Sequence, residues 1–260
     1  MYVGVDIGGT KTLVATLDDN GVIQARHQFK TPKDYDKFLE SLRHTALSLG
    51  TSDFRAGCIA VPGRIDREQG VVRHLGNLPW INVPLYADAV DIFNCPIALE
   101  HDGVLGGLSE SMLLPADKRV LYVTISTGIG TGLIDHQQIV SEMSDSEGGQ
   151  IQLQFHGKRT SWESFASGSA IVERFGKKAA EIEDSATWKR IAHDLAQGFI
   201  ELIAIMQPDI IVVGGSVGRY FDRYKDYLVK EISQYDNPMA PLPSFRAAQR
   251  PLPQSGRRPE

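Results

Sequence analysis

The chain has 260 residues, 42% of them hydrophobic, and a formal net charge of -5. That length can bury a full core in one large or two moderate domains, and the negative charge argues against a dominant nucleic-acid surface. With Cys58 and Cys95 as its two cysteines, the chain lacks a disulfide framework and cannot build a four-cysteine metal site. No leader-like segment opens the sequence and no apolar run approaches the roughly 18 residues of a membrane span, so we expect a cytoplasmic protein without membrane contacts.

The opening stretch, residues 3–13, reads VGVDIGGTKTL and predicts a β-hairpin with an acid at its tip. Gly8 and Gly9 lack Cβ atoms, so the backbone there can take positive φ and bring its N–H groups close to a ligand. Donors follow at Thr10, Lys11 and Thr12, and Asp6 just before the turn could face a metal ion. The alternative is a plain Gly-Gly hairpin with a solvated tip, and this stretch alone does not decide between the two.

The first half of the chain continues in the order β-β-β-α-β-α-β, which predicts a mixed sheet flanked by helices. The expected elements are a third strand at 21–29, a helix at 35–49 ended by Gly50, a strand at 57–61, a helical patch at 87–93 and a strand at 96–100.

The second half begins with a helix at 104–112, and from Val120 the opening pattern restarts. A strand at 120–125, a glycine-rich turn at 126–132 and a further strand hint at an internal duplication. The remaining predicted elements are a loop at 141–149, a helix at 162–175 interrupted at Gly168, a helix at 187–206, a buried strand at 209–213 and a helix at 220–232. From Pro238 onward prolines replace any periodicity, and from about Arg250 we expect irregular structure.

Three glycine turns stand at strand ends: DIGGTKT at Asp6, STGIGTG at Ser126 and VVGGSVG at Val212. The acidic segment EHDGVLGGLSE, residues 100–110, lies between the first two. In this order the motifs resemble the ROK (repressor/ORF/kinase) family of sugar kinases, from the first strand to about residue 218. The resemblance implies an α/β fold of the two-lobed, actin-like ATPase (ribonuclease H-like) type, with mixed sheets flanked by helices. The lobes would be residues 1–116 and 117–249, followed by an irregular tail at 250–260.

The resemblance also implies that the first two turns hold the phosphates of ATP and that the third lies near its adenosine. The ATP-binding residues carried over are Asp6, Gly8, Gly9, Thr10, Lys11, Thr127, Gly128, Gly130, Thr131, Gly132, Gly214 and Gly215. The cofactors would be ATP and Mg²⁺. Asp6 would position Mg²⁺ through water, because this ion gives up its hydration reluctantly.

Asp102 is the expected catalytic base. The family has an E-N-D-A-N segment whose aspartate takes this role, and here the segment reads Glu100-His101-Asp102-Gly103-Val104. A sugar hydroxyl that attacks the γ-phosphorus needs a nearby carboxylate to orient it and to take its proton. The alternative is an exposed aspartate that caps the following helix.

The sugar-binding residues implied by the resemblance are Asn77, His101, Asp102, Glu147, Gln150 and Glu163. Asn77 comes from a segment like the family's N-L-x-x-W…V-P-L, and Glu147 and Gln150 occupy the place of its E-x-G-H. A turn residue at Asn77 and a solvated glutamate at the helix start at Glu163 are the alternatives.

Residues 157–163, GKRTSWE, contain no cysteine where the family has its zinc-binding cluster, and Gln150 cannot be an imidazole ligand. We therefore expect no zinc site there, and packing by Trp162 or Phe165 in its place. After Arg250 we find no counterpart of the family's terminal glycine- and alanine-rich helix. Loss of such a helix would reduce stability or require an oligomer contact, so a homodimer is kept open.

The expected activity is ATP-dependent phosphorylation of a hexose, with glucose phosphorylated at its 6-hydroxyl as the first choice. The alternatives are an N-acetylhexosamine kinase and a degenerate, inactive sugar-binding member, with polyphosphate as another donor. The partners are then a small-molecule sugar and a nucleotide rather than nucleic acid or membrane. Repressors of the family carry an N-terminal helix-turn-helix, whereas this sequence opens on a strand.

Overall fold

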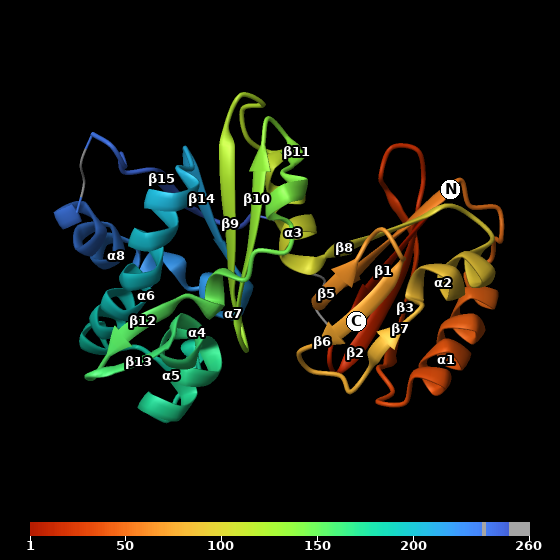
Figure 1. Ribbon diagram of the computed structural model, residues 1–260, viewed down its shortest axis with the longest axis horizontal. Helices are drawn as coiled ribbons and strands as arrows, with labels where there is room; N and C mark the ends of the chain where they lie inside the picture. The colour runs from red at the N-terminus through yellow and green to blue at the C-terminus, as the bar shows by residue number, and fades with distance from the viewer. Residues whose placement is uncertain (236–237, 250–260) are drawn as a thin grey trace. The chain divides into compact units, whose positions relative to one another are not determined.

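The computed structural model describes residues 1–235 and 238–249, and the chain divides into two units (Figure 1). The first unit comprises residues 1–105 and the second begins at Gly106. The division falls inside helix α3 (Asp102–Ser111), whereas the sequence placed it after residue 116. Each unit has its own five-stranded sheet and its own hydrophobic core. In the part of the chain that the structure describes, no helix is both long and apolar enough to cross a membrane.

The sheet of the first unit has the strand order β3-β2-β1-β4-β8. Its strands are β1 (Tyr2–Ile7), β2 (Lys11–Leu17), β3 (Ile23–Lys30), β4 (Ala56–Val61) and β8 (Ile97–His101). β1 pairs antiparallel with β2 and parallel with β4, and β4 pairs parallel with β8. The alternate residues Val3, Val5 and Ile7 are buried, as the period-two pattern predicted. They share a core with α1 (Tyr35–Leu47) and α2 (Leu85–Phe93).

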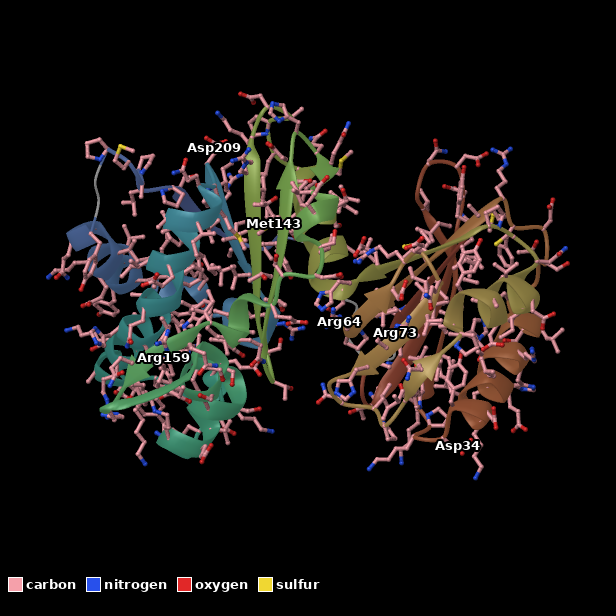
Figure 2. All side chains as sticks on the ribbon, in the orientation of Figure 1. Asp34, Arg64, Arg73, Met143, Arg159 and Asp209 are labelled. Carbon is pink, nitrogen blue, oxygen red and sulfur yellow. The ribbon has the colours of Figure 1, made fainter. Side chains whose placement is uncertain are left out.

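A second, three-stranded sheet in this unit was missed by the sequence reading. It consists of β5 (Gly63–Asp66), β6 (Val71–Leu75) and β7 (Ile81–Val83). These strands are only three to five residues long and carry charged residues such as Arg73, so they give little periodic signal. The Arg73 side chain, labelled in Figure 2, donates to Asn82 Oδ1 at 3.2 Å and so links β6 to the next strand.

The sheet of the second unit repeats the strand order of the first, as β11-β10-β9-β14-β15. Its strands are β9 (Arg119–Ile125), β10 (Ile129–Asp135), β11 (Gln138–Ile139), β14 (Ile210–Gly214) and β15 (Ser244–Ala247). β9 pairs antiparallel with β10 and parallel with β14, and β14 pairs parallel with β15. Two sheets with the same order and the same strand directions are what an internal duplication predicts.

Except for the short helix at Gly215–Gly218, the helices of the second unit fall on the predicted helical segments. They are α4 (Trp162–Ala166), α5 (Gly168–Phe175), α6 (Ser185–Met206), α7 (Gly215–Gly218) and α8 (Lys225–Ile232). Short 3₁₀ turns lie at η1 (Ser141–Met143), η2 (Gly148–Gln150), η3 (Ala179–Glu181), η4 (Phe221–Arg223) and η5 (Ser233–Tyr235). The apolar residues at helical spacing in α6 are all buried: Trp188, Ile191, Leu195, Phe199, Leu202, Ile203 and Met206. Asp184 caps the start of α6, and Gln207 ends it in the left-handed conformation at φ 45°.

Several short features of this unit were not predicted, among them strand β11 and helix α7. The hairpin of β12 (Gln152–Phe155) and β13 (Lys158–Ser161) precedes α4. Strand β15 falls where the prolines suggested no regular structure, and it pairs with Ile210–Val213 at the edge of the sheet. Four residues with only Phe245 buried are too few to show a period. The predicted irregular tail at 250–260 lies outside the described residues.

Candidate active-site residues

Asp6 and Asp102 lie at the same end of the parallel part of the first unit's sheet. Asp6 is the penultimate residue of β1, and Asp102 follows β8 directly as the first residue of α3. β4 separates the two strands, and all three run parallel. Burial raises the pKa of Asp6, and the Asp102 carboxylate raises it further. In open α/β sheets this end of parallel strands is where ligands bind.

The pair of carboxylates suits a hydrated divalent cation, because a cation would relieve the repulsion that raises the pKa of Asp6. Among the described residues, no cluster of three or more His, Cys, Asp or Glu side chains could enclose a metal ion. Mg²⁺ typically binds through one or two carboxylates and keeps several waters, so the donor set fits this ion better than one that needs a full protein cage.

The glycines of the β1–β2 turn are required by space, not by backbone conformation. Neither Gly8 nor Gly9 has positive φ, contrary to the sequence argument. A Cβ on Gly8 would stand 2.8 Å from the Lys11 carbonyl oxygen, and one on Gly9 would stand 2.6 Å from Asn77 Cβ. The Gly8 N–H donates to the Lys11 carbonyl at 3.0 Å. The turn is therefore tight, with Thr10 and Lys11 exposed at its tip.

Thr12 does not join the donors at the tip of this turn. Its side chain is fully buried, and its hydroxyl lies 2.9 Å from the hydroxyl of Thr31. Thr31 in turn donates to the Gly8 carbonyl at 2.7 Å, so this pair of hydroxyls supports the turn from below.

Asn77 lies against the first glycine turn, so the structure brings a predicted sugar ligand and a predicted phosphate loop together. The adjacent residues explain how: Leu78 and Trp80 are buried, while Asn77 itself is exposed. The Trp80 indole N–H donates to the Lys33 carbonyl at 2.9 Å, which anchors the segment to the residues just before α1. In the N-L-x-x-W pattern, the buried side chains of Leu78 and Trp80 thus fix the segment while the side-chain amide of Asn77 stays exposed.

Asp102 is accessible, with a side chain 45% exposed, whereas the preceding His101 side chain is only 11% exposed. Asp102 Oδ1 accepts a hydrogen bond from Gly103 N–H at 2.7 Å and lies 3.2 Å from His101 Nδ1. Glu100 accepts from the backbone N–H of His101 at 2.7 Å and forms an ion pair with Arg67. The E-H-D segment is therefore held at several atoms, and the Asp102 side chain is partly exposed.

In the second unit, Glu163 joins three of the predicted site segments. Its Oε1 accepts from Gln150 Nε2 at 2.7 Å, and its Oε2 accepts from the Ile129 N–H at 3.2 Å. A Cβ on Gly128 would stand 2.7 Å from Oε2 of the same carboxylate. Glu163 therefore lies directly against the second glycine turn. Sequence reasoning assigned Glu163 to the sugar alone and gave no sign of this link.

The second glycine turn is shorter than predicted, because β10 already begins at Ile129. Gly130 and Gly132 lie within that strand, opposite Thr124 and Tyr122. The hydroxyl of Thr131 is buried and engaged inside the protein: it donates to the Ser146 carbonyl at 3.0 Å and accepts from Gly148 N–H at 3.2 Å. These two bonds hold the loop that presents the exposed Glu147.

The third glycine turn borders a cavity of about 330 Å³, the lower end of the range usual for small-molecule sites. Gly215 has φ +84°, and a Cβ on it would stand 2.4 Å from the Ile125 carbonyl oxygen. Ser216 N–H donates to Ser126 Oγ at 3.0 Å, which ties the second and third turns together. The cavity is lined by Tyr122, Ser126, Gly214, Gly215, Arg219 and Gln249, among others. Of these, sequence reasoning identified only the two glycines.

Aromatic packing holds the corner where the resemblance placed a zinc cluster. The rings of Phe155 on β12 and Phe165 on α4 stack with centroids 4.2 Å apart and an interplanar angle of 7°. Trp162 is fully buried, and a Cβ on Gly198 of α6 would stand 2.1 Å from its ring. Both residues named from the sequence therefore pack at this corner.

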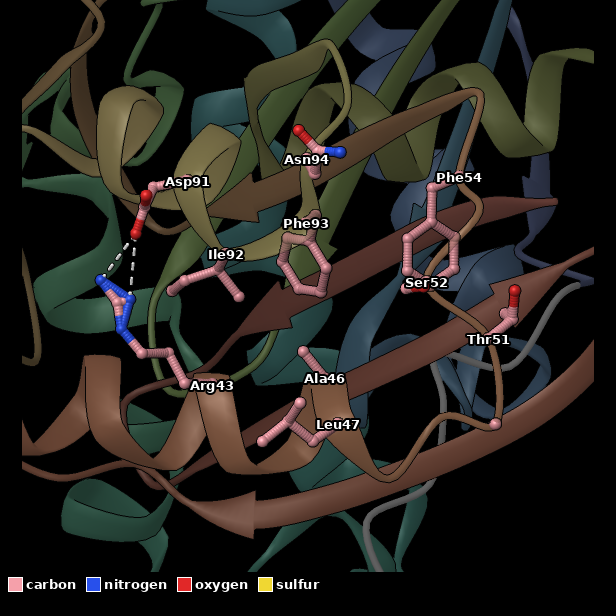
Figure 3. A pocket seen from close by; sticks show the side chains of 11 residues that line it. Arg43, Ala46, Leu47, Thr51, Ser52, Phe54, Asp91, Ile92, Phe93 and Asn94 are labelled. Atoms are coloured by element: carbon pink, nitrogen blue, oxygen red, sulfur yellow. Dashed lines mark hydrogen bonds and ion pairs between the residues drawn. The ribbon is translucent and has the colours of Figure 1, made fainter.

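Another cavity of about 620 Å³ lies at the C-terminal ends of α1 and α2, and Figure 3 shows its lining. The Arg43–Asp91 ion pair, with 2.9 Å between Nη2 and Oδ2, borders an apolar floor that includes Ile92 and Phe93. None of the predicted site residues lines it. We therefore do not take this cavity as the candidate active site, although it is larger than the one at the third glycine turn.

Comparison with known proteins gives a consistent result. The sequence model of the ROK family matches residues 2–254. A fructokinase of Streptococcus mutans is 25% identical over 84% of this chain and 80% of its own length, and an N-acetylmannosamine kinase of Yersinia pestis is 28% identical over 83% of each.

Among solved structures, a ROK family glucokinase from Streptomyces griseus, in complex with glucose and AMPPNP, has a TM-score of 0.79. It is 22% identical and covers 95% of this chain and 94% of its own. At this identity the likeness establishes the fold, which is that of the actin-like ATPases. The resemblance read from the three turns is confirmed: the chain belongs to the ROK family.

Proposed function

We propose that this protein is a kinase that transfers the γ-phosphoryl group of ATP to a hexose hydroxyl, with the 6-hydroxyl of glucose as the first candidate. The observation that carries the proposal is the placement of Asp102. This accessible carboxylate follows β8 directly. It is close enough to Asp6, near the end of the parallel strand β1, to raise the pKa of that residue. The tight Gly8–Gly9 turn belongs to the same unit. Membership in the ROK family and the sugar kinases among its relatives support it.

In the proposed reaction, Asp102 orients the sugar hydroxyl and takes its proton as the oxygen bonds to the γ-phosphorus and the bond to ADP breaks. Asp6 would hold Mg²⁺, and the bound ion would supply positive charge that offsets part of the charge on the phosphates. Both acids belong to the first unit, so their separation is fixed by the parallel strands that carry them.

Each unit contains residues that we propose for nucleotide binding, and the two sets are described separately. In the first, Thr10 and Lys11 offer a hydroxyl and an ammonium group at the exposed tip of the turn. In the second, Thr127 is exposed on the turn after β9, and the cavity at Gly214 and Gly215 accepts the adenosine. Exposed backbone N–H groups and hydroxyls of this kind are suited to phosphate.

For the sugar we propose the residues that the family resemblance implies: Asn77, Glu147, Gln150 and Glu163. The hydrogen bond from Gln150 to Glu163 gives the glutamine a defined function in the place of the family's histidine, because it orients the carboxylate. Carboxylates and amides accept from and donate to sugar hydroxyls.

The second candidate function is an N-acetylhexosamine kinase. A relative named N-acetylmannosamine kinase favours it, and His101, Val104 and Gln150 are the altered positions where we expect such a preference to show. Fructose belongs among the test substrates because another relative is named fructokinase.

A coupled assay of ADP release tests the proposal with glucose, fructose, mannose, N-acetylglucosamine and N-acetylmannosamine. We expect release with at least one plain hexose, dependent on both ATP and Mg²⁺. Release only with N-acetylated sugars would establish the second candidate, and glucose 6-phosphate formed from polyphosphate would reassign the donor. Measurable sugar binding without phosphoryl transfer from either donor would show a degenerate, sugar-binding protein.

A further inference from the structure

Glu163, which we propose for the sugar, lies on a helix too short to fix its own position. α4 has five residues, and a helix of about one turn is not stable by itself, because its nucleation is unfavourable. Contacts with the rest of the second unit must therefore hold α4 in place. These contacts decide whether the Glu163 carboxylate meets Gln150 and the Ile129 N–H.

Arg174, near the end of α5, holds the C-terminal end of α4. Its Nη1 atom donates to the carbonyl of Phe165, and the last carbonyls of a helix have no partner inside it. Phe165 is only two residues from Glu163 along the chain. The Arg174 side chain is 22% exposed, so most of it lies inside the protein.

The guanidinium group of Arg174 also packs against the aromatic rings at this corner. Its Cζ atom lies 4.9 Å from the centroid of the Phe155 ring, and that ring stacks on Phe165. Arg174 thus contacts the backbone of Phe165 directly and supports its ring through Phe155. A planar guanidinium can donate from its edge and stack with its face, whereas the ammonium group of lysine has no such plane.

Asp194 on α6 is connected to both ends of α4. Its Oδ2 atom lies 2.9 Å from Arg174 Nη1 in an ion pair, and its side chain is only 7% exposed. Its backbone carbonyl accepts from the indole N–H of Trp162, the first residue of α4, at 3.3 Å. Trp162 and Phe165 stand on either side of Glu163 in the sequence. The residues that flank Glu163 are therefore both tied to one position on α6.

Geometry explains this ion pair better than stability does. Burial raises the pKa of Asp194 and the charge of Arg174 opposes that shift, so the pair forms against a cost of desolvation. Apolar side chains of similar size often replace a buried pair without loss of stability. They cannot, however, donate a hydrogen bond to the Phe165 carbonyl.

We propose that Arg174 is a positioning residue for the sugar site: paired with Asp194, it holds the Phe165 carbonyl, so that the Glu163 carboxylate stays in place for the sugar hydroxyls. The proposal rests on the proposed kinase function, in which Glu163 binds the sugar. Arg174 acts through α4 and needs no contact with the sugar itself.

The double variant Arg174→Met/Asp194→Leu separates positioning from stability, because it removes both charges and keeps two apolar side chains in their place. We expect a melting temperature equal to or above that of the unaltered protein. The Kd for the sugar that the ADP-release panel selects, with glucose as the first choice, should rise by about 10- to 100-fold, the usual cost of losing a group that orients a binding residue. Calorimetric titration measures this Kd.

Arg190→Ala is the matched control. Arg190 is exposed and its guanidinium lies over the ring of Phe175, but within the described part of the chain it makes no hydrogen bond to α4. The Kd for the sugar should change by less than about twofold, as for most surface substitutions. A double variant whose Kd stays within that same limit would overturn the proposal. A melting temperature that falls together with the affinity would show a structural role only and would overturn it as well.

A second measurement depends on neither sugar nor turnover. In ¹⁵N–¹H spectra of protein labelled at isoleucine, the Ile129 amide, assigned by the signal lost in Ile129→Val, reports its hydrogen bond to the Glu163 carboxylate. We expect this signal to move upfield in the double variant and in Glu163→Ala, and to stay in place in Arg190→Ala. An Ile129 signal unchanged in the double variant would overturn the proposal. A moved signal in a protein that phosphorylates no sugar would contradict the kinase function alone.

Discussion

The side-chain amide of Gln150 donates to Glu163 Oε1 over 2.7 Å, and the other oxygen of the same carboxylate accepts from the Ile129 N–H at the second glycine turn. One carboxylate therefore joins a residue proposed for the sugar to a turn proposed for phosphate. Because each oxygen has a separate partner, the Gln150 contact can be removed without touching the turn.

We predict that Gln150→Ala raises the KM for the sugar by about 10-fold, because a hydrogen bond to a charged group contributes roughly 1.5 kcal/mol or more. The KM for ATP should change by less than about twofold, since the contact of Glu163 with the turn remains. Steady-state kinetics with each substrate varied in turn measure both values. Gln154→Ala, at an exposed glutamine further along β12, is the matched control. Equal effects on both constants would show that Gln150 does not act on the sugar side.

We predict that Gly9→Ala disrupts the first turn, because its Cβ would meet Asn77 Cβ at 2.6 Å. Overpacking of this kind costs about 1–3 kcal/mol, and relief by movement of Asn77 would weaken sugar binding as well. Gly76→Ala is the control, since a Cβ there has no atom within 4 Å. The thermal unfolding temperature and the sugar KM should both change in Gly9→Ala. Neither should change in Gly76→Ala. A Gly9→Ala protein indistinguishable from the control would contradict the steric account.

We predict that Asp6→Asn stabilises the protein at pH 7, although it impairs catalysis. The folded-state pKa of Asp6 is raised by burial and by Asp102, so the folded protein binds the proton more tightly than the unfolded chain. The unfavourable contribution of Asp6 is therefore absent below the unfolded pKa and grows as pH rises through the folded pKa. Urea midpoints of the two proteins should converge near pH 3.5 and separate by pH 7, with the variant higher. A variant that is less stable than the unaltered protein at pH 7 would show that ionised Asp6 stabilises the fold, contrary to this prediction.

We predict that Phe165→Ala costs about 3–5 kcal/mol of unfolding free energy, the usual range for a buried phenylalanine. Phe165 is 2% exposed and stacks on Phe155, so removal of its ring would leave a cavity in the core. Ile205→Ala, whose side chain is 68% exposed, should cost far less and serves as the control. Dialysis against EDTA should leave the melting temperature unchanged. A fall on chelation, with zinc in the dialysate, would show that metal rather than packing supports this corner.

The elements with a strong period or a clear terminal signal were predictable from the sequence. The opening hairpin and the long helix α6 are examples, and the order of three turns and one acid led to the family. The β5–β6–β7 sheet and strand β15 were missed, because their stability comes from pairing with distant segments rather than from a local pattern.

The site shows the same distinction between local and distant signals. The sequence placed Asp102 at the end of a strand, which the structure also shows. It could not show that Glu163 reaches a turn 34 residues away. The sequence singled out the glycines of the first turn because glycine can take positive φ, but neither glycine has positive φ. Gly9 is required because Asn77 approaches it closely, and a contact between residues so far apart in the sequence leaves no local pattern.

The variant Asp102→Asn shows whether Asp102 is the base of a phosphoryl transfer. This variant keeps the shape of the side chain and removes its charge. In single-turnover experiments with the preferred hexose and ATP, we expect the rate of phosphoryl transfer to fall by about 10²- to 10⁴-fold, while the Kd for ATP stays within about threefold. Transfer at a rate close to that of the unaltered protein would contradict the assignment.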